Sequence, residues 1–287
     1  MLRSDKFERA FIEWADSMRD VSFKNEVIAI DGKTVRGSKD SFHEKSPIHI
    51  VSARANSNQL VLGQFKTDSK SNEITAIPKL LELLELEGSI ITIDAMGTQR
   101  EIAQAIIENK ADYILALKGN QGSLKEEVEH IFTRQSPNSE NTTIEKGHGR
   151  IETRKCEVIT DLTFLDEKEN WVSLASIIKV DSQREINGKA TQETRMYISS
   201  VKDDGKRFNS LIRQHWGIEN SLHWTLDVTL NEDNQRKRNG MAAQNFALIQ
   251  KIVLNLLRDE NSNKISLKNK RFKAGWDDAF LLKILKI

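Results

Sequence analysis

Three acidic residues in this chain occupy positions that favour metal-dependent chemistry. Asp31 follows the apolar run 27–30, Asp94 follows the apolar run 90–93, and Glu219 lies in an aromatic-rich stretch with helical spacing. An apolar run that ends in an acid and small residues places a carboxylate at the end of a buried strand, where it can still reach solvent. Three carboxylates brought together repel one another unless a divalent cation neutralises them. The pattern therefore predicts a metal site built from these three acids.

Each acid also has a simpler interpretation. An Asp after a strand often caps a turn or the next helix. Glu219 would also suit a surface ion pair with Arg213 or a neighbouring histidine. A shared site for Asp31 and Asp94 is favoured because their strands are expected to be neighbours in one sheet, so that both acids emerge at the same edge. Small residues follow each of them and let a large substrate approach.

Two histidines flank Glu219. The spacing i, i+4, i+8 of His215, Glu219 and His223 raises the alternative of a zinc or other transition-metal site on one helix. Three ligands spread over two full turns reach one ion poorly. We therefore expect the histidines to contact a DNA phosphate or the attacking water. Continuous helical spacing would place them and Glu219 on one face with Ile212, Trp216, Leu222 and Leu226.

Cations follow the first acid. Gly32-Lys33-Thr34 resembles the end of a phosphate-binding P-loop, but that motif requires a glycine where this chain has Val27. We interpret Lys33 and Arg36 as cations that hold phosphate oxygens beside the acids.

A second basic motif spans residues 146–154. It is expected to be a turn that enters a strand, with Arg150, Glu152 and Arg154 on one face. This face is either solvated and self-paired or, with His148, contacts phosphate. Both interpretations remain open from the residues alone.

Composition excludes several classes of protein. The 287 residues include 43 Lys and Arg against 42 Asp and Glu, a net charge of +1, so nucleic-acid binding must rest on local clusters such as 236–238 and 264–273. The single cysteine, Cys156, excludes an internal disulfide and a Cys-rich zinc site, and we expect it to be buried and inert. No signal peptide opens the chain, and its apolar runs are too short to span a bilayer.

The first half of the chain alternates strands and helices. This order implies crossover connections and a partly parallel sheet, and its leading strand and hairpin match a ribonuclease H-like core. Pro78 is expected in the first turn of its helix. We expect helices at 5–20, 76–86, 99–109 and 124–133, strands at 27–30, 48–52, 60–65, 90–93 and 113–117, and a hairpin turn at 55–58.

The second half begins with a different pattern. Residues 135–148 are polar and turn-rich, then strands are expected at 151–159, 172–180 and 193–199, and helices at 208–228, 241–257 and 276–285. The fold class is therefore α/β, a ribonuclease H-like mixed-sheet core with a β-rich insertion and a C-terminal helical block. The expected domains are an N-terminal helix (1–22), the first part of the core (23–134), the insertion (135–205) and helices that complete the core (206–287).

Five motifs carry a family resemblance from about residue 5 to the C-terminus. The chain resembles the ISAs1-type transposases, including the H-repeat-associated proteins, within the IS4-like DDE group. The motifs are IAIDGKTVRGS, TIDAMGTQREIAQAII, DYILALKGNQ, HGRIETR and HWGIENSLHWTLDVTLNED. The resemblance implies that Asp31, Asp94 and Glu219 are the catalytic triad and bind two Mg²⁺ (or Mn²⁺) ions.

The resemblance also implies partners and a location. Double-stranded DNA, as transposon terminal inverted repeats and target DNA, is the expected partner, with a homodimer as the acting form, no membrane and a cytoplasmic, nucleoid-associated location. The expected DNA-binding residues are Lys33, Arg36, Lys118, His148, Arg150, Arg154, Arg213, His215 and His223.

Two features depart from the family pattern. We expect the N-terminal segment that family members usually carry to be missing before the first helix, and residues 1–22 to be the remnant of a longer region. The signature around the glutamate keeps Arg213 but has Ile212 in place of a tyrosine and Leu226 in place of a lysine. The expected function is metal-dependent DNA strand cleavage and strand transfer at insertion-sequence ends. The alternatives are a truncated, catalytically silent remnant with residual DNA binding, and a phosphohydrolase with a small closed pocket.

Overall fold

The computed structural model describes residues 2–19, 24–67, 73–147, 149–262 and 264–287. It divides into two compact units. The first unit comprises Met1–Ser22, Asp31–Leu84 and Gly217–Ile287, and the second comprises Phe23–Ile30 and Glu85–Trp216. Strand β1 (Val27–Thr34) contributes its first half to the second unit and its second half to the first.

The second unit is built on a mixed sheet. Its strands follow the order β1-β4-β5-β9-β8-β7-β6. β1, β4 (Ile90–Ile93) and β5 (Asp112–Leu117) are parallel, and β9 pairs antiparallel with β5. The apolar residues of β1 and β4 are almost fully buried, as expected for parallel strands covered on both faces.

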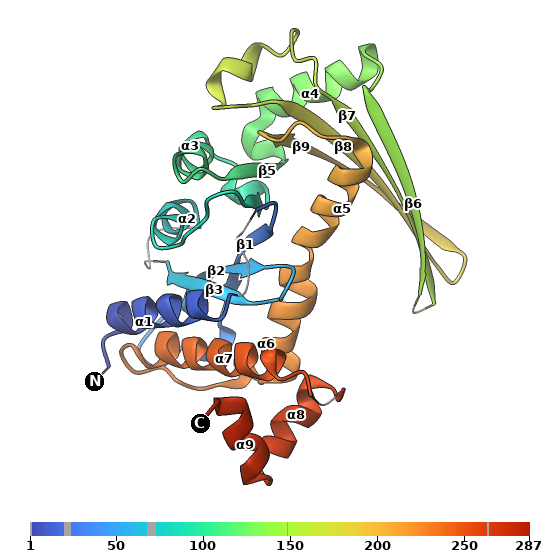
Figure 1. Ribbon diagram of the computed structural model, residues 1–287. Coiled ribbons are helices and arrows are strands. Elements are labelled where there is room, and N and C mark those ends of the chain that lie inside the picture. Colours follow the sequence, from blue (N-terminus) through green and yellow to red (C-terminus); the bar gives the residue numbers. More distant parts are fainter. Residues whose placement is uncertain (1, 20–23, 68–72, 148, 263) are drawn as a thin grey trace. The chain divides into compact units, whose positions relative to one another are not determined.

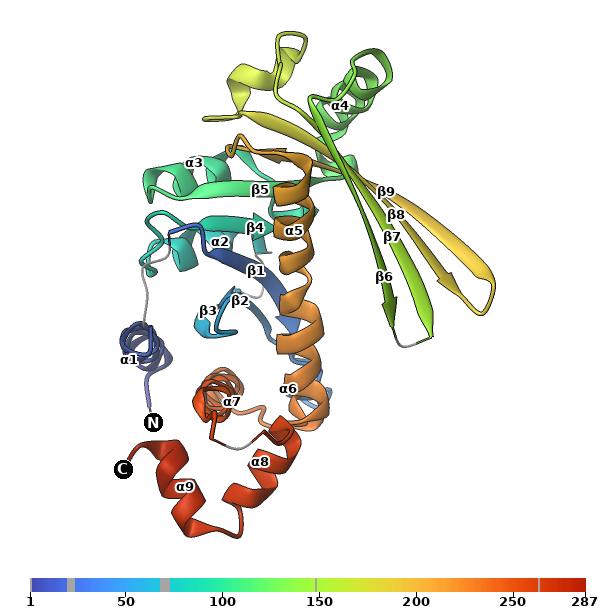
Figure 2. The same cartoon turned by 45° about the vertical axis from the view of Figure 1, so that its right-hand side comes forward.

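Four long antiparallel strands extend this sheet. They are β6 (Ser139–Gly147), β7 (Arg150–Ile159), β8 (Ser176–Ile186) and β9 (Lys189–Ser199). Figure 2 shows them as a twisted ribbon that runs on past α5. Two expectations were wrong here: residues 139–147 form a strand instead of a turn-rich segment, and the strand expected at 172–180 begins at Ser176.

Helices cover the sheet of the second unit. They are α3 (Arg100–Glu108), α4 (Gly122–Arg134) and α5 (Gly205–His215). Phe208, Leu211 and Ile212 of α5 pack into a core with Cys156 and Val158 of β7. Cys156 is buried as expected. This packing fixes the helix that leads toward the predicted glutamate.

The first unit joins a hairpin to a helical block. The hairpin is β2 (His49–Ala55) and β3 (Val61–Lys66), which follows β1 in the strand order. In Figure 1, α1 (Ser4–Ser17) and α7 (Ala242–Asp259) run side by side. Asn255 of α7 exchanges two 2.9 Å hydrogen bonds with the backbone of Val61, which ties α7 to the hairpin.

The remaining helices of the first unit complete the block. They are α2 (Glu73–Leu81), a π-helical segment (Ile218–His223), α6 (Trp224–Val228), α8 (Leu267–Ala274) and α9 (Asp278–Leu285). The helix expected at 76–86 begins and ends earlier, so Pro78 lies inside it and not in its first turn. Helix α8 was not predicted. None of the helices in the described part of the chain combines the length and apolar character needed to cross a bilayer.

Candidate functional site

The two aspartates follow residues that are paired in register. In the second unit, the pairing of β1 with β4 ends with Ile30 opposite Ile93. Asp31 and Asp94 are the next residues along these strands. Both isoleucines are buried, so core packing fixes the two strand ends. The two acids therefore follow aligned positions on adjacent strands.

Asp94 caps a turn. Its Oδ1 accepts a 3.1 Å hydrogen bond from Met96 N and begins the 3₁₀ turn Ala95–Gly97. Asn120 Nδ2 donates to Ala95 O at 2.6 Å and so ties this turn to the one after β5. The simpler interpretation of this Asp is thus confirmed, but the cap involves one oxygen of the carboxylate and fixes the direction of the other.

Asp31 lies beside a half-buried histidine. Its Oδ1 accepts from Gly32 N at 2.9 Å, and His223 Nδ1 lies 3.5 Å from its Oδ2. Burial, followed by the charges of Lys251 and Lys33, lowers the pKa of His223 to about 3, so the ring is uncharged at neutral pH. Within the described residues, His223 Nε2 is buried and has no hydrogen-bond partner. A neutral imidazole with an unpaired nitrogen suits a role in orienting the carboxylate or a water.

A second histidine lies behind Gly32 and was not singled out from sequence. His49 Nε2 lies 2.7 Å from Glu73 Oε1, and His49 Nδ1 lies 2.9 Å from Thr34 Oγ1. A Cβ atom on Gly32 would lie 2.1 Å from that glutamate oxygen. The glycine after Asp31 therefore makes room for this pair. No local pattern links residues 34, 49 and 73, so only the fold reveals the contact.

Glu219 lies in a π-helical segment. Residues Ile218–His223 adopt this wider turn, in which Ile218 and Leu222 are buried and Glu219 is exposed. The expectation of one continuous face that includes Glu219 was wrong, because it assumed uninterrupted α-helical spacing. Single π turns recur at functional sites, where they redirect a side chain.

Buried Arg54 and half-buried Arg258 hold the backbone around Glu219. Arg54 lies against Gly217 so closely that a Cβ there would be 2.6 Å from its Nη1. Arg258 Nη2 donates to Ser221 O at 2.8 Å. Burial, followed by the charge of Arg54, lowers the pKa of Arg258 to about 9. The π-helical segment is therefore anchored by charged groups from β2 and α7.

His215 connects α5 to β4 within the second unit. Its Nδ1 lies 3.0 Å from Thr92 Oγ1, two residues before Asp94. Burial lowers the pKa of His215 to about 4, although the charge of Asp94 acts in the opposite direction. The neighbouring Trp216 ring lies under the Arg195 guanidinium at 4.2 Å. His215 is therefore neutral and hydrogen-bonded to the sheet.

Lys33 is surrounded by carboxylates. Its Nζ lies 2.7 Å from Asp227, 2.8 Å from Glu232 and 3.2 Å from Asp233. Burial lowers the pKa of Lys33, but the charges and hydrogen bonds of Glu232 and Asp227 outweigh it, so the pKa is raised overall. Arg36 is exposed, and its backbone N–H donates to Asp233 at 3.1 Å. Lys33 thus neutralises protein acids, whereas the Arg36 side chain is largely exposed, with its Nε 3.6 Å from Asp233.

The arginines of the second basic motif form ion pairs. Arg154 and Arg213 contact the two oxygens of Glu145 at 2.7 and 2.9 Å. Glu152 lies 3.3 Å from Arg154 and 3.8 Å from Arg150. Arg154 is buried, and burial, followed by the charge of Arg213, lowers its pKa. Three arginines share two glutamates, so this face of the ribbon keeps a positive excess.

Lys118 and His148 are the remaining two predicted DNA contacts. Lys118 is exposed and precedes the turn Gly119–Gln121 after β5. This turn lies at the same end of its strand as the Asp94 turn, to which Asn120 connects it. His148 lies outside the described residues.

The donor set has the chemistry of a hard-cation site. Asp31 and Asp94 each accept a backbone N–H with one oxygen, which orients the carboxylate. Carboxylate oxygens suit Mg²⁺ and Mn²⁺. Among the described residues, no three His, Cys, Asp or Glu side chains lie close enough to hold an ion. Asp31 and Glu219 belong to the first unit and Asp94 to the second.

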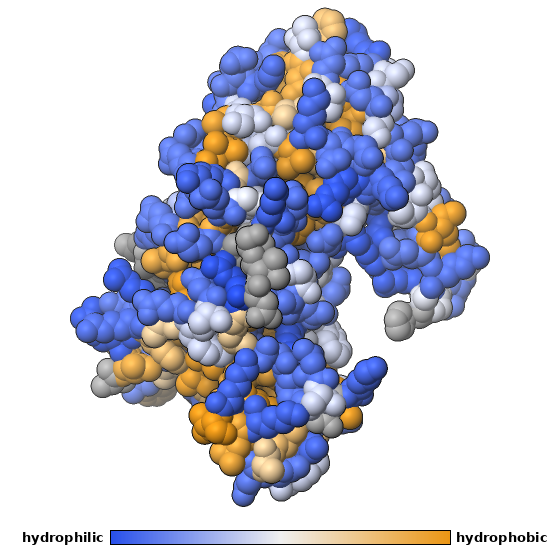
Figure 3. Space-filling model, in the orientation of Figure 1, coloured by the Kyte–Doolittle hydropathy of each residue, from blue (hydrophilic) through white to orange (hydrophobic). Residues whose placement is uncertain are grey.

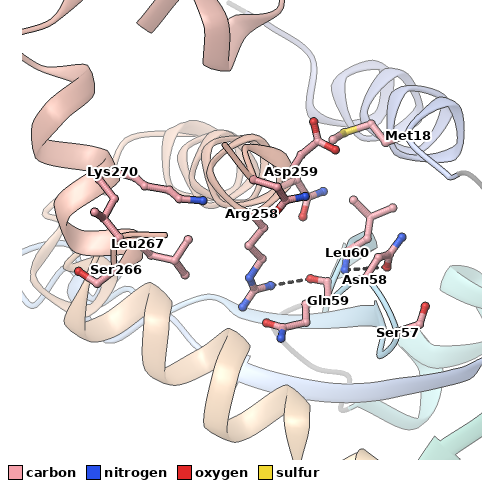
Figure 4. Close-up of a pocket in the computed structure, with 13 residues that line it drawn as sticks. Met18, Ser57, Asn58, Gln59, Leu60, Arg258, Asp259, Ser266, Leu267 and Lys270 are labelled. Carbon is pink, nitrogen blue, oxygen red and sulfur yellow. Dashed lines mark hydrogen bonds between the residues drawn. The ribbon is translucent and has the colours of Figure 1, made fainter. Parts of the chain in front are cut away.

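A separate pocket of about 620 Å³ lies in the first unit (Figure 4). Its lining includes Arg258 and Lys270 and none of the three acids. Arg258 donates to Gln59 O at 2.6 Å, and Lys270 donates to Leu257 O at 3.1 Å. Because these charges are paired with backbone, the pocket does not resemble the small phosphate-substrate site of the phosphohydrolase alternative.

Known proteins identify the family. The model of the transposase DDE domain matches residues 22–256. The chain is 45% identical over 289 residues to "Putative transposase YncI" of Escherichia coli O157:H7, covering 97% of this chain and 73% of that protein. It is 42% identical over 293 residues to "H repeat-associated putative transposase YhhI" of Escherichia coli K12, covering 98% and 76%.

A solved structure supports the fold. The piggyBac transposase, in a synaptic complex with hairpin DNA, matches with a TM-score of 0.53 at 12% identity, over 92% of this chain and 55% of that one. This chain therefore spans about half of piggyBac, and the likeness concerns fold alone. Together with the mixed sheet, it confirms the predicted ribonuclease H-like α/β fold. The domain match and the relatives show that the chain belongs to the DDE transposase family.

Proposed function

We propose that this chain is an ISAs1-type transposase of the IS4-like DDE group, which cleaves DNA at insertion-sequence ends and transfers the freed 3′-hydroxyl to target DNA. The observation that carries the proposal is the register of β1 and β4, in which the pair Ile30 and Ile93 immediately precedes Asp31 and Asp94. Family membership supplies the reaction class.

Asp31, Asp94 and Glu219 would hold two Mg²⁺ or Mn²⁺ ions. When bound, such ions would activate the nucleophile and stabilise the leaving oxygen of an in-line displacement. The protein contributes orientation. The buried strands fix the backbone before each aspartate, and the hydrogen bonds from Gly32 N and Met96 N fix the carboxylates.

The two histidines support the acids as neutral rings. His223 lies beside Asp31 and orients its carboxylate or a bound water. His215 is hydrogen-bonded to Thr92 and holds α5 against β4. Both rings are uncharged at neutral pH, so they act as hydrogen-bonding groups and not as cations.

Double-stranded DNA is the proposed substrate, as terminal repeats and as target, and the acting form is a homodimer. Arg36, Lys118 and Arg150 supply phosphate contacts, because their side chains are not enclosed by protein. Lys33 and Arg154 act through the acids that they neutralise. We assign the ribbon β6–β9 to the proposed insertion at 135–205, where it would carry part of this contact.

Metal-dependent nicking of a DNA end substrate tests the proposal. Asp31→Asn and Asp94→Asn are expected to abolish nicking in Mg²⁺. Asp112→Asn is the matched control, because Asp112 begins β5 opposite Ile90, at the other end of the parallel strands. If both active-site variants nick as well as the control, the site is wrongly assigned. DNA binding without nicking by the unmodified chain would favour the silent remnant.

A further inference from the structure

Helix α8 and the turn that follows it present an aromatic pair to solvent. Phe272 is 41% exposed and Trp276 is 73% exposed. Their rings are stacked, with centroids 6.4 Å apart and an interplanar angle of 13°. The spacing i, i+4 places both rings on one side of the helix end. Large aromatic side chains are usually buried in soluble domains, so an exposed stacked pair indicates a ligand.

Cations adjoin these rings. Lys268, one turn before Phe272, has its Nζ 5.9 Å from the Phe272 centroid, and the Arg271 guanidinium lies 5.0 Å from it. Arg271 also donates to Thr229 O, which fixes its position. Lys268, Phe272 and Trp276 therefore form a strip of one cation and two rings.

The surrounding segment is strongly basic. Residues 264–287 contain seven Lys and Arg against two Asp, in a chain that has 43 against 42 overall. Several of these charges are paired: Lys270 and Lys283 lie 3.6 and 3.5 Å from Glu260, Lys273 lies 3.8 Å from Asp277, and Lys286 lies 2.8 Å from Asp259. Lys268 and Arg271 are the cations beside the rings. The positive excess attracts a polyanion and disfavours a second copy of the same surface.

Figure 3 shows hydrophobic side chains at the lower end of the view among hydrophilic ones, where α9 lies. Leu282 and Leu285 of α9 are 48% and 42% exposed. The surface of α8 and α9 is therefore both apolar and cationic. A ligand that suits it combines a flat apolar face with negative charge.

We propose that α8 binds an unpaired nucleotide, whose base stacks on Trp276 and whose phosphates meet Lys268 and Arg271. Every base has a π-face that an aromatic side chain can stack on, but within a duplex that face is covered by neighbouring base pairs. Single-stranded DNA is therefore the favoured ligand. The inference rests on the proposed function in taking DNA as the substrate.

Fluorescence anisotropy of a labelled single-stranded oligonucleotide, titrated with the full chain, tests the proposal. Trp276→Leu is expected to weaken binding about tenfold, the typical loss for one stacked base. Trp276→Phe keeps a ring and is expected to retain most of the affinity. Lys268→Gln is expected to make the affinity less dependent on salt, because one phosphate contact is lost.

Trp224→Leu is the control, since Trp224 is exposed on α6. Equal affinities for wild type and Trp276→Leu, or an equal loss in Trp224→Leu, would overturn the proposal. It also fails if Trp276 is needed for binding anionic lipid vesicles or for self-association while no oligonucleotide binds. Binding through Trp276 without any nicking would instead refute the proposed function, and nicking with normal binding by Trp276→Leu would refute only this inference.

Discussion

Gly32 lies against the Glu73 carboxylate, so that a Cβ on the glycine would be 2.1 Å from Oε1. The same atom would lie 2.4 Å from His49 Nε2. The pair of His49 and Glu73 therefore fits beneath β1 only because the residue after Asp31 has no side chain. The backbone that orients the Asp31 carboxylate is thus coupled to a hydrogen bond on the other side of the strand.

Gly32→Ala is expected to destabilise the first unit by about 1–3 kcal/mol, the usual cost of forcing extra volume into a packed site. Nicking should fall as well, since Asp31 must shift with its neighbour. Gly119→Ala is the control, because nothing lies within 4 Å of a Cβ there. Urea unfolding measures the effect. In the double variant Gly32→Ala with Glu73→Ala, removal of the clash should restore part of the loss, and no recovery would show that the clash is not the cause.

Lys33→Met is expected to be among the most destabilising substitutions near the site. It leaves Asp227, Glu232 and Asp233 without their shared cation, and breaking a largely buried pair costs about 3–5 kcal/mol. Burial already raises the pKa of Asp227, and loss of the Lys33 charge and hydrogen bond, which lower it, raises this pKa further in the folded variant. The loss relative to wild type should therefore grow as the pH rises from about 4 to 7.

Urea unfolding of Lys33→Met at both ends of that pH range measures this growth. Lys125→Met is the control, because it removes only a surface pair with Glu129 on α4. A loss that does not depend on pH would mean that Lys33 contributes packing and not charge.

Strands with apolar runs were predictable from sequence, and polar elements were not. The segments ending at Ile30 and Ile93 are continuous apolar runs, which are typical of strands buried on both faces of a sheet. Strand β6 has no such pattern, because most of its side chains are exposed or half-buried, and it is held by backbone pairing to β7. Helix α8 was missed for the same reason, since its sequence LKNKRFKA has no apolar stripe.

The acids themselves were proposed from local sequence, but their surroundings were not. Asp31 and Asp94 could be singled out because each directly follows a run of apolar residues. The partners of Lys33 lie about 200 residues away, and no periodicity connects Lys33 with Glu232. Arg54 lies against Gly217, immediately before the π-helical segment. Helical spacing in the sequence cannot predict this contact between residues far apart in the chain.

We expect the protonation of His215 to make the free energy of unfolding depend on pH. The pKa of His215 is about 4 in the folded chain against an ordinary value of 6.5, so the unfolded chain binds a proton first as the pH falls. The contribution of neutral His215 is complete above pH 6.5 and is lost as the pH falls from 6.5 toward 4, by an amount on the order of 1–3 kcal/mol. His215→Gln, which can still bond Thr92, should be less sensitive over this range.

Thermal unfolding of wild type and His215→Gln between pH 4 and 7 checks this difference. The control is His130→Gln, which changes an exposed histidine on α4 and should leave the wild-type pH dependence intact. Identical curves for wild type and His215→Gln would show that other groups set the acid sensitivity.

The rate at which the Cys156 thiol reacts with a reagent measures how well α5 packs on β7. Cys156 is the single cysteine of the chain, it is fully buried beside Phe208, and burial raises its pKa to about 12. We expect no reaction with a thiol reagent near pH 8 until the second unit opens, because only the thiolate reacts. Phe208→Ala should speed labelling by at least about a hundredfold, since such a cavity costs about 3–5 kcal/mol. Val228→Ala, at an exposed position on α6, should not. Labelling of the native chain as fast as in denaturant would contradict this packing and, with it, the placement of the helix that leads to Glu219.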